Sequence, residues 1–480
     1  MKLILIVPNY QLANDAKHMY YAYAPYNLCI LAAMVEDICK VEIIDAYGNN
    51  FSESEIASAI EKSAPDVVGI TVLMDQMAQT GHKVAEITKI ISPNIITILG
   101  GVYATMNPMV AVKDVNLDYI CVGEGEYVLR GLMEFFQNKT KSFPHKGLVY
   151  KENGKIVNQG RSDFINDLDA LPHPAYHLIE FDKYSNQVSR ENSVDSPRTF
   201  PYARLYTSRG CPFACSFCQV GSISGRKFRY RSVENTIAEI KLLKESYGIK
   251  SFIVSDDNFF LNRTRVESIL KAMIEQGLLM PWLSEDTGIM HMDKKLLELM
   301  HKSGCEYIGC AIETGNDRIM KDIIGGKRFT KEHALEMVSI AKNLGMYVAA
   351  NFIIGFPTET WDEIRETIQF AESLKADYTR IFNLVPLKNT KLWDICVREN
   401  SFIDGYDHFN LNASWNSGQV KSSEYSSNDL TILRTFEWDR INFSSSEKRK
   451  KTANRLEISK EALNCIRQNT RENMYESLKI

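Results

Sequence analysis

The sequence has no long apolar run and no excess of positive charge. No stretch of its 480 residues approaches the roughly 18 consecutive apolar residues that a membrane-spanning helix needs. The formal net charge of −4 provides no general attraction to nucleic acid or to an anionic membrane surface. The apolar start, Met1–Pro8, is too short to be the core of a secretion signal. We therefore expect a cytoplasmic protein without a membrane span, and we do not expect a nucleic-acid partner.

The sequence also lacks the cysteine pattern of a disulfide-bonded protein. Most of its 10 cysteines are scattered along the chain, as is usual for buried thiols in a reducing compartment. The scattered ones are Cys29, Cys39, Cys121, Cys305, Cys310, Cys396 and Cys465. The other three, Cys211, Cys215 and Cys218, lie close together, which indicates a shared chemical role.

Three clustered thiols are typical of a zinc site or an iron–sulfur cluster, because soft metals prefer thiolate ligands. A structural zinc ion normally has four ligands. No further cysteine or histidine lies near this group, since His177 is well before it and Cys305 well after it. Three ligands without a fourth favour a [4Fe–4S] cluster with one iron left open, and zinc remains the alternative.

Residues 1–140 alternate short apolar strands with helical patterns. Strands are expected at 3–7, 41–44, 66–71, 95–99 and 119–122, with helices at 26–38, 54–63 and 77–91 between them. Fully apolar strands separated by helices predict a doubly wound, Rossmann-like parallel sheet. Ligands of such sheets bind beyond the carboxyl ends of the strands.

Residues 201–395 repeat this alternation, so the whole chain is expected to be an α/β protein. Strands are expected at 204–207, 251–254, 282–284, 307–312, 347–354 and 378–385. Six strand–helix steps predict a partial (β/α)6 barrel of the TIM type, since a closed barrel has eight. The proline-rich residues 141–200 are expected to be a connector, and 396–480 a mainly helical tail.

The stretch Ser208–Cys218, which reads Ser-Arg-Gly-Cys-Pro-Phe-Ala-Cys-Ser-Phe-Cys, resembles the CxxxCxxC signature of radical S-adenosylmethionine (SAM) enzymes. The resemblance includes an aromatic residue, Phe217, before the last cysteine. It implies that the three cysteines hold a [4Fe–4S] cluster whose open iron binds the amino and carboxylate groups of SAM. One electron from the cluster then cleaves SAM to methionine and a 5′-deoxyadenosyl radical.

Later segments resemble other SAM-binding elements of this family. Asp256-Asp257 matches the position that binds the SAM amino group, although a helix N-cap is the alternative for one aspartate. Glu313 resembles the residue that contacts the ribose, and Gly355 the glycine that lines the adenine. The basic pair 327–328 resembles the segment near the SAM carboxylate, with solvated surface as its alternative. The implied SAM-binding residues are Phe217, Asp256, Asp257, Glu313, Lys327, Arg328 and Gly355.

The first 140 residues resemble the cobalamin-binding domain that precedes the barrel in one radical SAM class. The resemblance depends on segments 45–46, 65–71, 100–105 and 122–126. The residues that it implies for cobalamin binding are Asn9, Asp45, Thr71, Gly100, Gly101, Tyr103, Gly123, Glu124 and Glu126. Tyr103 stands where the class often has histidine. No Asp-x-His-x-x-Gly motif is present, so no histidine is expected to bind cobalt from below. Ordinary turn geometry is the alternative for the glycines.

Together these resemblances imply a methyltransferase acting on an unactivated carbon or phosphorus centre. Members of the class also form or contract rings and modify lipids or pigments, and these activities stay open as alternatives. A non-catalytic iron–sulfur or corrinoid carrier or sensor is another alternative, although it would not need a SAM pocket. A methylthiotransferase is disfavoured because residues 1–140 contain no second compact cysteine group. The expected partners are a small-molecule, natural-product or lipid substrate and an external electron donor such as flavodoxin or ferredoxin.

Overall fold

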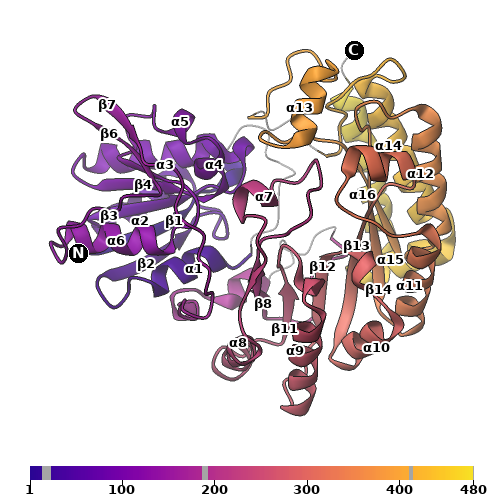
Figure 1. Ribbon diagram of the computed structural model, residues 1–480, viewed down its shortest axis with the longest axis horizontal. Helices are drawn as coiled ribbons and strands as arrows, with labels where there is room; N and C mark the ends of the chain where they lie inside the picture. The colour runs from indigo at the N-terminus through magenta and orange to yellow at the C-terminus, as the bar shows by residue number, and fades with distance from the viewer. Residues whose placement is uncertain (13–22, 186–192, 410–414, 479–480) are drawn as a thin grey trace.

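The computed structural model describes residues 1–12, 23–185, 193–409 and 415–478, which contain two α/β sheets side by side (Figure 1). The first sheet has the strand order β2-β1-β3-β4-β5-β6-β7. Its strands are β1 (Lys2–Val7), β2 (Lys40–Asp45), β3 (Val67–Thr71), β4 (Ile96–Gly100), β5 (Tyr119–Cys121), β6 (Leu148–Glu152) and β7 (Lys155–Asn158). Strands β1 to β5 are parallel, with Leu3 opposite Val41 on one side and Val67 on the other.

Helices cover both faces of this sheet, which is why its central strands are apolar along their length. The helices are α1 (Tyr26–Ala33), α2 (Glu53–Ser63), α3 (Ala78–Ile91), α4 (Gly101–Met106), α5 (Pro108–Ala111) and α6 (Glu126–Phe136). α1 contacts α6, and α2 contacts α3. Ser52 begins α2 with a capping box that it shares with Glu55. The predicted Rossmann-like arrangement is confirmed.

Residues 148–158 correct the expectation that 141–200 is only a connector. They form the antiparallel hairpin β6–β7, whose first strand pairs with β5 so that Tyr150 lies opposite Tyr119. The sheet is therefore mixed rather than wholly parallel. The turn residues Asn153 and Gly154 both have positive φ, 49° and 77°. An Asn-Gly pair is a typical hairpin signal in a sequence, so this element was predictable.

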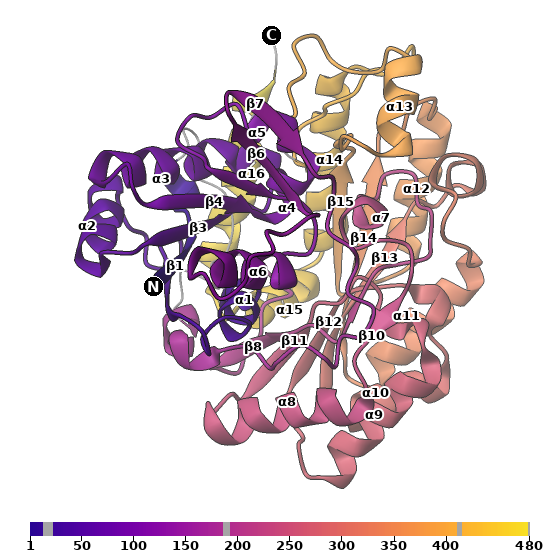
Figure 2. The same cartoon turned by 60° about the vertical axis from the view of Figure 1, so that its left-hand side comes forward.

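The second sheet has six parallel strands in the order β15-β14-β13-β12-β11-β8. They are β8 (Tyr202–Leu205), β11 (Ser251–Val254), β12 (Trp282–Thr287), β13 (Cys305–Glu313), β14 (Tyr347–Ile354) and β15 (Tyr378–Asn383). The outer helices are α8 (Val233–Ser246), α9 (Arg263–Glu275), α10 (Lys294–Lys302), α11 (Lys331–Asn343) and α12 (Trp361–Ser373) (Figure 2). The predicted six-strand partial barrel is confirmed.

Side chains of these strands alternate between two separate cores. Phe252 and Ile308 face the core beneath the outer helices. Tyr307 and Tyr347 face the opposite side, where they pack with Trp438 of the carboxyl-terminal helices. These helices are α14 (Ser427–Phe443), α15 (Ser446–Leu456) and α16 (Lys460–Ser477), preceded by α13 (Lys391–Arg398). The predicted helical tail therefore fills the inner side of the partial barrel.

α14 also covers the outer edge of β15, the last strand of the second sheet. The Thr379 N–H donates to Asn442 Oδ1 at 2.7 Å, and Asn442 Nδ2 donates to the Thr379 carbonyl at 2.8 Å. Arg434 Nε donates to the Ile381 carbonyl at 2.9 Å. Side chains of α14 thus satisfy backbone groups that an edge strand otherwise exposes. Among the described residues we find no helix with the length and apolar character that crossing a membrane requires.

Replacing Asn442 by alanine should loosen β15. The substitution leaves a buried backbone N–H and C=O without partners, which costs about 1–3 kcal/mol. Hydrogen exchange of peptides covering 378–383 should become roughly 5- to 150-fold faster. Asn454→Ala, at an exposed position of α15, is the control and should leave that exchange unchanged. Equal exchange in both variants would show that the Asn442 amide does not hold the strand.

Candidate functional site

The three clustered cysteines lie in a loop at the carboxyl edge of the second sheet. The loop begins after β9 (Ser208–Arg209), passes through α7 (Val220–Ile223) and ends at β10 (Arg229–Tyr230), which pairs antiparallel with β9. Cys215 is buried, while Cys211 and Cys218 are half-buried. The Cys211 N–H donates to the Gly225 carbonyl at 3.2 Å and the Cys218 N–H to the Cys215 carbonyl at 3.2 Å. The short ribbon β9–β10 therefore holds the three thiols in one compact loop.

Later segments of the same chain pack tightly against the centre of this loop. The Ser216 N–H donates to the Ile324 carbonyl, and the Leu392 N–H donates to the Ser216 carbonyl, both at 2.9 Å. A Cβ atom at Gly326 would overlap Cys215 Sγ, so the backbone there can approach only as glycine. The loop is thus fixed from two sides by residues more than 100 positions later in the chain.

The thiols influence one another's ionisation. Burial raises the pKa of Cys215 to about 11, Lys327 opposes that shift, and the thiols of Cys218 and Cys211 add to it. Burial also raises the pKa of Cys218. No three His, Cys, Asp or Glu side chains in the described ranges converge tightly enough to bind a single metal ion. A cubane cluster places its thiolates on different iron atoms, so its ligands need not converge on one point.

The two aspartates predicted to bind SAM hold the segment that leads into the cysteine loop. Asp256 accepts hydrogen bonds from Thr207 N at 2.5 Å and from the hydroxyls of Thr207 and Ser208 at 2.6 Å. Asp257 Oδ2 accepts from Gly210 N at 2.7 Å. Burial raises the pKa of Asp256, and the hydroxyl donors oppose that rise. Asp256 is therefore engaged within the protein, whereas the Asp257 side chain is exposed.

Glu313 and Lys327 meet beside the cysteine loop. The Lys327 ammonium forms an ion pair with Glu313 and also donates to the Ala311 carbonyl at 3.4 Å. Glu313 ends β13 with a φ of 72°, a left-handed conformation that is strained for a residue with a side chain. Such strain occurs preferentially at ligand-binding positions. Arg328, the second residue of the basic pair, is exposed.

Gly355 lies at the end of β14, where a buried glutamate holds the backbone. Gly355 has a φ of 88°, and a Cβ there would lie 2.6 Å from Leu430 Cδ1. The N–H groups of Gly355 and Phe356 both donate to Glu359 Oε2, at 2.7 and 2.9 Å. The Phe217 ring lies 6.4 Å from that of Phe356, centroid to centroid. Glu359 was not predicted as a site residue, because a glutamate just before a helix is common and does not by itself indicate a buried role.

Several residues predicted at the carboxyl edge of the first sheet are buried and bound internally. Asn9 Nδ2 donates to the Phe51 carbonyl at 2.9 Å. Asp45 accepts from the Tyr184 hydroxyl and the Gly48 N–H, both at 2.8 Å. Such contacts shape the edge of the sheet rather than present polar groups beyond it.

Thr71 and the glycines of the same edge are held by the ends of β3 and β4. Thr71 Oγ1 accepts from Asn27 Nδ2 at 3.1 Å. Gly100 ends β4, and Gly101 follows it with a φ of 92°. A Cβ atom on Gly101 would overlap the Val72 carbonyl oxygen. The turn into α4 therefore requires glycine at position 101.

Tyr103 belongs to a chain of three polar side chains behind this edge. Its hydroxyl lies 3.0 Å from His82 Nε2, and His82 Nδ1 lies 2.6 Å from Asp114 Oδ2. Burial raises the pKa of Tyr103 to about 12, so the phenol stays protonated. Since Asp114 must accept from Nδ1, the other ring nitrogen of His82 can accept from the phenol.

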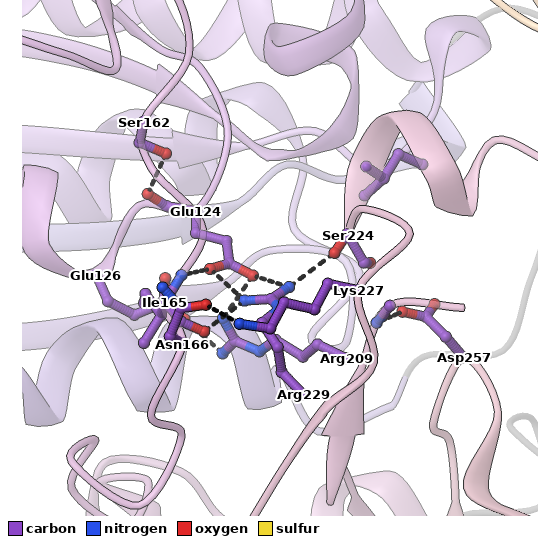
Figure 3. A network of polar contacts seen from close by, with 12 residues as sticks. Glu124, Glu126, Ser162, Ile165, Asn166, Arg209, Ser224, Lys227, Arg229 and Asp257 are labelled. Carbon is purple, nitrogen blue, oxygen red and sulfur yellow. Dashed lines mark hydrogen bonds and ion pairs between the residues drawn. The ribbon is translucent and has the colours of Figure 1, made fainter. Parts of the chain in front are cut away.

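Glu124 and Glu126 point toward the cysteine loop of the second sheet (Figure 3). Glu124 lies 2.8 Å from Arg229 and 3.4 Å from Arg209, and Glu126 lies 2.5 Å from Arg209. Gly123, just before them, has a φ of 99° and closely approaches Ser162. The resemblance implied a corrinoid contact for both carboxylates, but in this structure their partners are guanidinium groups. Neither Arg209 nor Arg229 was predicted as a site residue.

The two sheets turn their carboxyl edges toward one another. α4, which follows the Gly100-Gly101 turn, contacts α7 of the cysteine loop. Asn389 Nδ2 donates to the Met106 carbonyl at 3.5 Å. Three thiols on a six-stranded partial barrel, facing the ligand-binding edge of a Rossmann-like sheet, define the architecture of a two-domain radical SAM protein.

Comparison with known proteins gives the family. Residues 205–371 match the model of the radical SAM superfamily, and residues 16–133 match that of the B12-binding domain. An uncharacterised methyltransferase of Pyrococcus horikoshii is 33% identical over 401 residues, covering 83% of this chain and 84% of that protein. The chain belongs to the radical SAM enzymes that carry an amino-terminal B12-binding domain.

Two further proteins are similar over most of the chain. The cytidylyl-2-hydroxyethylphosphonate methyltransferase of Streptomyces wedmorensis is 28% identical over 452 residues, which cover 84% of this chain and 83% of that protein. The structure of the cobalamin-dependent SAM radical enzyme OxsB with aqua-cobalamin and SAM bound matches with a TM-score of 0.71 at 18% identity. That match covers 96% of this chain and 71% of the other, and it shows the shared fold.

Glu359 should make the protein's stability depend on pH. Burial raises the pKa of this carboxyl from 4.5 to about 8, so the folded protein keeps the proton after the unfolded chain has lost it. Its contribution to stability is complete below about pH 4.5 and declines as the pH rises toward 8. Glu359→Gln keeps an acceptor for the two N–H groups and has no proton to lose. We expect its melting temperature, relative to the wild type, to rise steadily between pH 5 and pH 8.

Thermal unfolding at several pH values measures this difference. Glu61→Gln, at an exposed position of α2, is the control and should show no such trend. A constant difference between Glu359→Gln and the wild type over this pH range would contradict a protonated Glu359 in the folded protein.

Proposed function

We propose that this chain is a cobalamin-dependent radical SAM methyltransferase that methylates an unactivated carbon or phosphorus centre of a small molecule. The observation that carries the proposal is the position of three thiols opposite the glycine-rich edge of the first sheet. The relatives of Pyrococcus horikoshii and Streptomyces wedmorensis, both named methyltransferases, support it. An external one-electron donor such as flavodoxin or ferredoxin completes the system.

The residues around the three thiols fit a [4Fe–4S] cluster with an open iron. Cys211, Cys215 and Cys218 would hold three irons and leave the fourth for SAM. The Lys327 ammonium beside Cys215 opposes the rise in pKa that burial gives this thiol, and a nearby positive charge favours an anionic thiolate ligand. A bound cluster would supply the electron that cleaves SAM to methionine and a 5′-deoxyadenosyl radical, and bound cobalamin would supply the methyl group.

The polar groups beside the cysteine loop fit the two ends of SAM. The exposed carboxylate of Asp257 is the better candidate for the SAM ammonium, because Asp256 is already engaged by three donors. Glu313 would accept from the ribose hydroxyls, and Lys327 beside it would face the SAM carboxylate. Gly355 has no side chain, so a flat base could lie against the backbone at the end of β14.

Bare backbone and an exposed apolar side chain at the edge of the first sheet support its assignment as the corrin site. Gly100 and Gly101 leave the end of β4 without side chains. Leu73, just beyond β3, is 40% exposed and would offer an apolar contact to the ring. Tyr103 keeps its hydroxyl on His82 behind this edge. Thr71 and the two glycines would thus hold the cofactor mainly through backbone contacts and shape.

Reductive cleavage of SAM tests the catalytic part of the proposal. The chain, reconstituted anaerobically with iron and sulfide and reduced with dithionite, should convert SAM to 5′-deoxyadenosine. A variant with serine at 211, 215 and 218 should lose the absorbance near 400 nm and the bound iron, because serine hydroxyls do not replace thiolates in such clusters. Liquid chromatography of the nucleoside and iron analysis measure both effects.

Cys465→Ser, at an exposed position far from the loop in sequence, is the control and should keep both the iron and the cleavage activity. A brown chromophore that survives in the triple variant would overturn the ligand assignment. A loaded, SAM-binding cluster that never releases 5′-deoxyadenosine would instead favour the carrier or sensor alternative.

Corrinoid binding tests the first sheet. Gly101→Ala should weaken retention of hydroxocobalamin about tenfold or more, because alanine is strained at a φ of 92° and its Cβ would overlap the Val72 carbonyl. The iron content should stay at the wild-type level, since the cysteine loop is untouched. Equilibrium dialysis monitored by the corrinoid spectrum gives the affinity.

Gly154→Ala is a matched control, because Gly154 also has positive φ, 77°, but its Cβ would meet nothing within 4 Å. It should retain the corrinoid as the wild type does. Equal corrinoid affinities in Gly101→Ala and Gly154→Ala would show that the edge around Gly101 is not part of the corrinoid site. A wild-type chain that binds no corrinoid would overturn the cobalamin-dependent proposal and leave the radical SAM activity to be judged by the cleavage test.

A further inference from the structure

Four charged side chains, three of them with less than a tenth of their surface exposed, lie together between the first sheet and the cysteine loop. Glu124 and Glu126 come from the loop after β5 and the start of α6, and their side chains are 9% and 6% exposed. Arg209 and Arg229 come from β9 and β10, with 22% and 1% of their side chains exposed. We name these four residues the interdomain charge cluster. Figure 3 shows the carboxylates directed at the guanidinium groups.

The two arginines stand directly opposite each other at the base of the cysteine loop. Arg229 is the register partner of Arg209 in the antiparallel ribbon β9–β10. Like charges in opposite positions of a ribbon repel each other. Glu124 lies within ion-pair distance of both, 2.8 and 3.4 Å, and Glu126 pairs with Arg209 at 2.5 Å. The ribbon that closes the cysteine loop is thus neutralised by carboxylates of the other sheet.

The two carboxylates differ in how many further partners they have. Glu124 also accepts from the Ile165 N–H at 2.6 Å, and Arg229 also donates to the Ile165 and Ser224 carbonyls at 2.7 Å. These contacts make Glu124 and Arg229 part of a larger structural junction. Glu126 lies at the first turn of α6, where the helix dipole favours a negative charge. Its ion pair with Arg209 is the simpler one to change.

This pair joins the two places where the proposed cofactors would be held. Glu126 is three residues after Gly123, in the loop that the resemblance assigns to cobalamin. Arg209 is two residues before Cys211, the first cluster ligand. A shift of the loop that contains Gly123 would move the Glu126 carboxylate. The Arg209 guanidinium paired with it would move as well, and Arg209 belongs to the strand that enters the cysteine loop.

We propose that Glu126 and Arg209 are positioning residues through which the first sheet fixes the cysteine loop and sets the reduction potential of its cluster. The inference rests on the proposed function only for the presence of the cluster. A negative charge near the loop disfavours the additional electron of the reduced cluster, and a positive charge favours it. The pair keeps these two influences in balance.

Redox titration of the reconstituted full chain, followed by electron paramagnetic resonance, tests the electrostatic part. Glu126→Gln should shift the potential upward, because Arg209 loses its closest negative partner. Arg209→Gln should shift it downward, and the double variant should return close to the wild type. Asp439→Asn, which removes the carboxylate paired with Arg467 at 2.6 Å in the carboxyl-terminal helices, should leave the potential unchanged.

Opposite shifts that cancel are the diagnostic outcome, because general damage to the fold would move both single variants in the same direction. An unchanged potential in both single variants, or a shift of the same sign in both, overturns the proposal. If Arg209→Gln takes up no iron, Arg209→Lys supplies the second comparison. Lysine keeps the charge and should keep the wild-type potential, and a shift as large as that of Glu126→Gln would count against the proposal.

Hydrogen exchange of the unloaded chain tests the positioning part without any cofactor. Peptides covering 208–230 should exchange faster in Glu126→Gln than in the wild type, and Asp439→Asn should not change them. Unchanged exchange in Glu126→Gln would overturn the positioning role even if the cluster can be loaded. A wild-type chain that binds no cluster would refute the proposed function, while this measurement would still decide whether Glu126 holds the loop.

Discussion

The buried charge of Arg229 constrains how the two sheets can be arranged. Its side chain is 1% exposed, and leaving such a charge without its carboxylate typically costs about 3–5 kcal/mol. Glu124 can serve as that partner only while the loop after β5 lies against the base of the cysteine loop. Rotating one sheet away from the other would leave the glutamates of one sheet and the arginines of the other without ion-pair partners. The arrangement in which the two carboxyl edges face each other therefore depends on this contact. The same arrangement would bring the proposed cofactors together.

A second feature of the site is that most of its polar side chains form hydrogen bonds with backbone groups of the protein. Asp256 accepts three hydrogen bonds from the segment before the cysteines, and Glu359 accepts two from the turn after β14. Groups fixed in this way preorganise a site, because the loops that carry the ligands need not be ordered on binding. The carboxylate of Asp257 is exposed and accepts one hydrogen bond, from the Gly210 N–H.

Much of the fold was predictable because it is written in local patterns. Apolar strands at regular spacing predicted the five parallel strands of the first sheet and the six of the second. The hairpin β6–β7 was missed although Asn153-Gly154 is a local turn signal, since the surrounding prolines suggested an irregular connector. The packing of α14 against β15 had no such signal. It depends on Asn442 meeting Thr379, 63 residues away, and the helix pattern gives no partner.

The sequence by itself determined the grouping of three thiols in one loop, the order of strands and helices, and the glycine turns at the strand ends. Those properties follow from spacing over a few residues, where covalent geometry fixes which groups lie together. Only the tertiary structure decided where the carboxylates of Glu124 and Glu126 point. Their arginine partners lie 105 and 83 residues later in the chain. Buried charges must be neutralised by whatever lies next to them in space, and that neighbour is chosen by the packing of two sheets rather than by any spacing in the sequence.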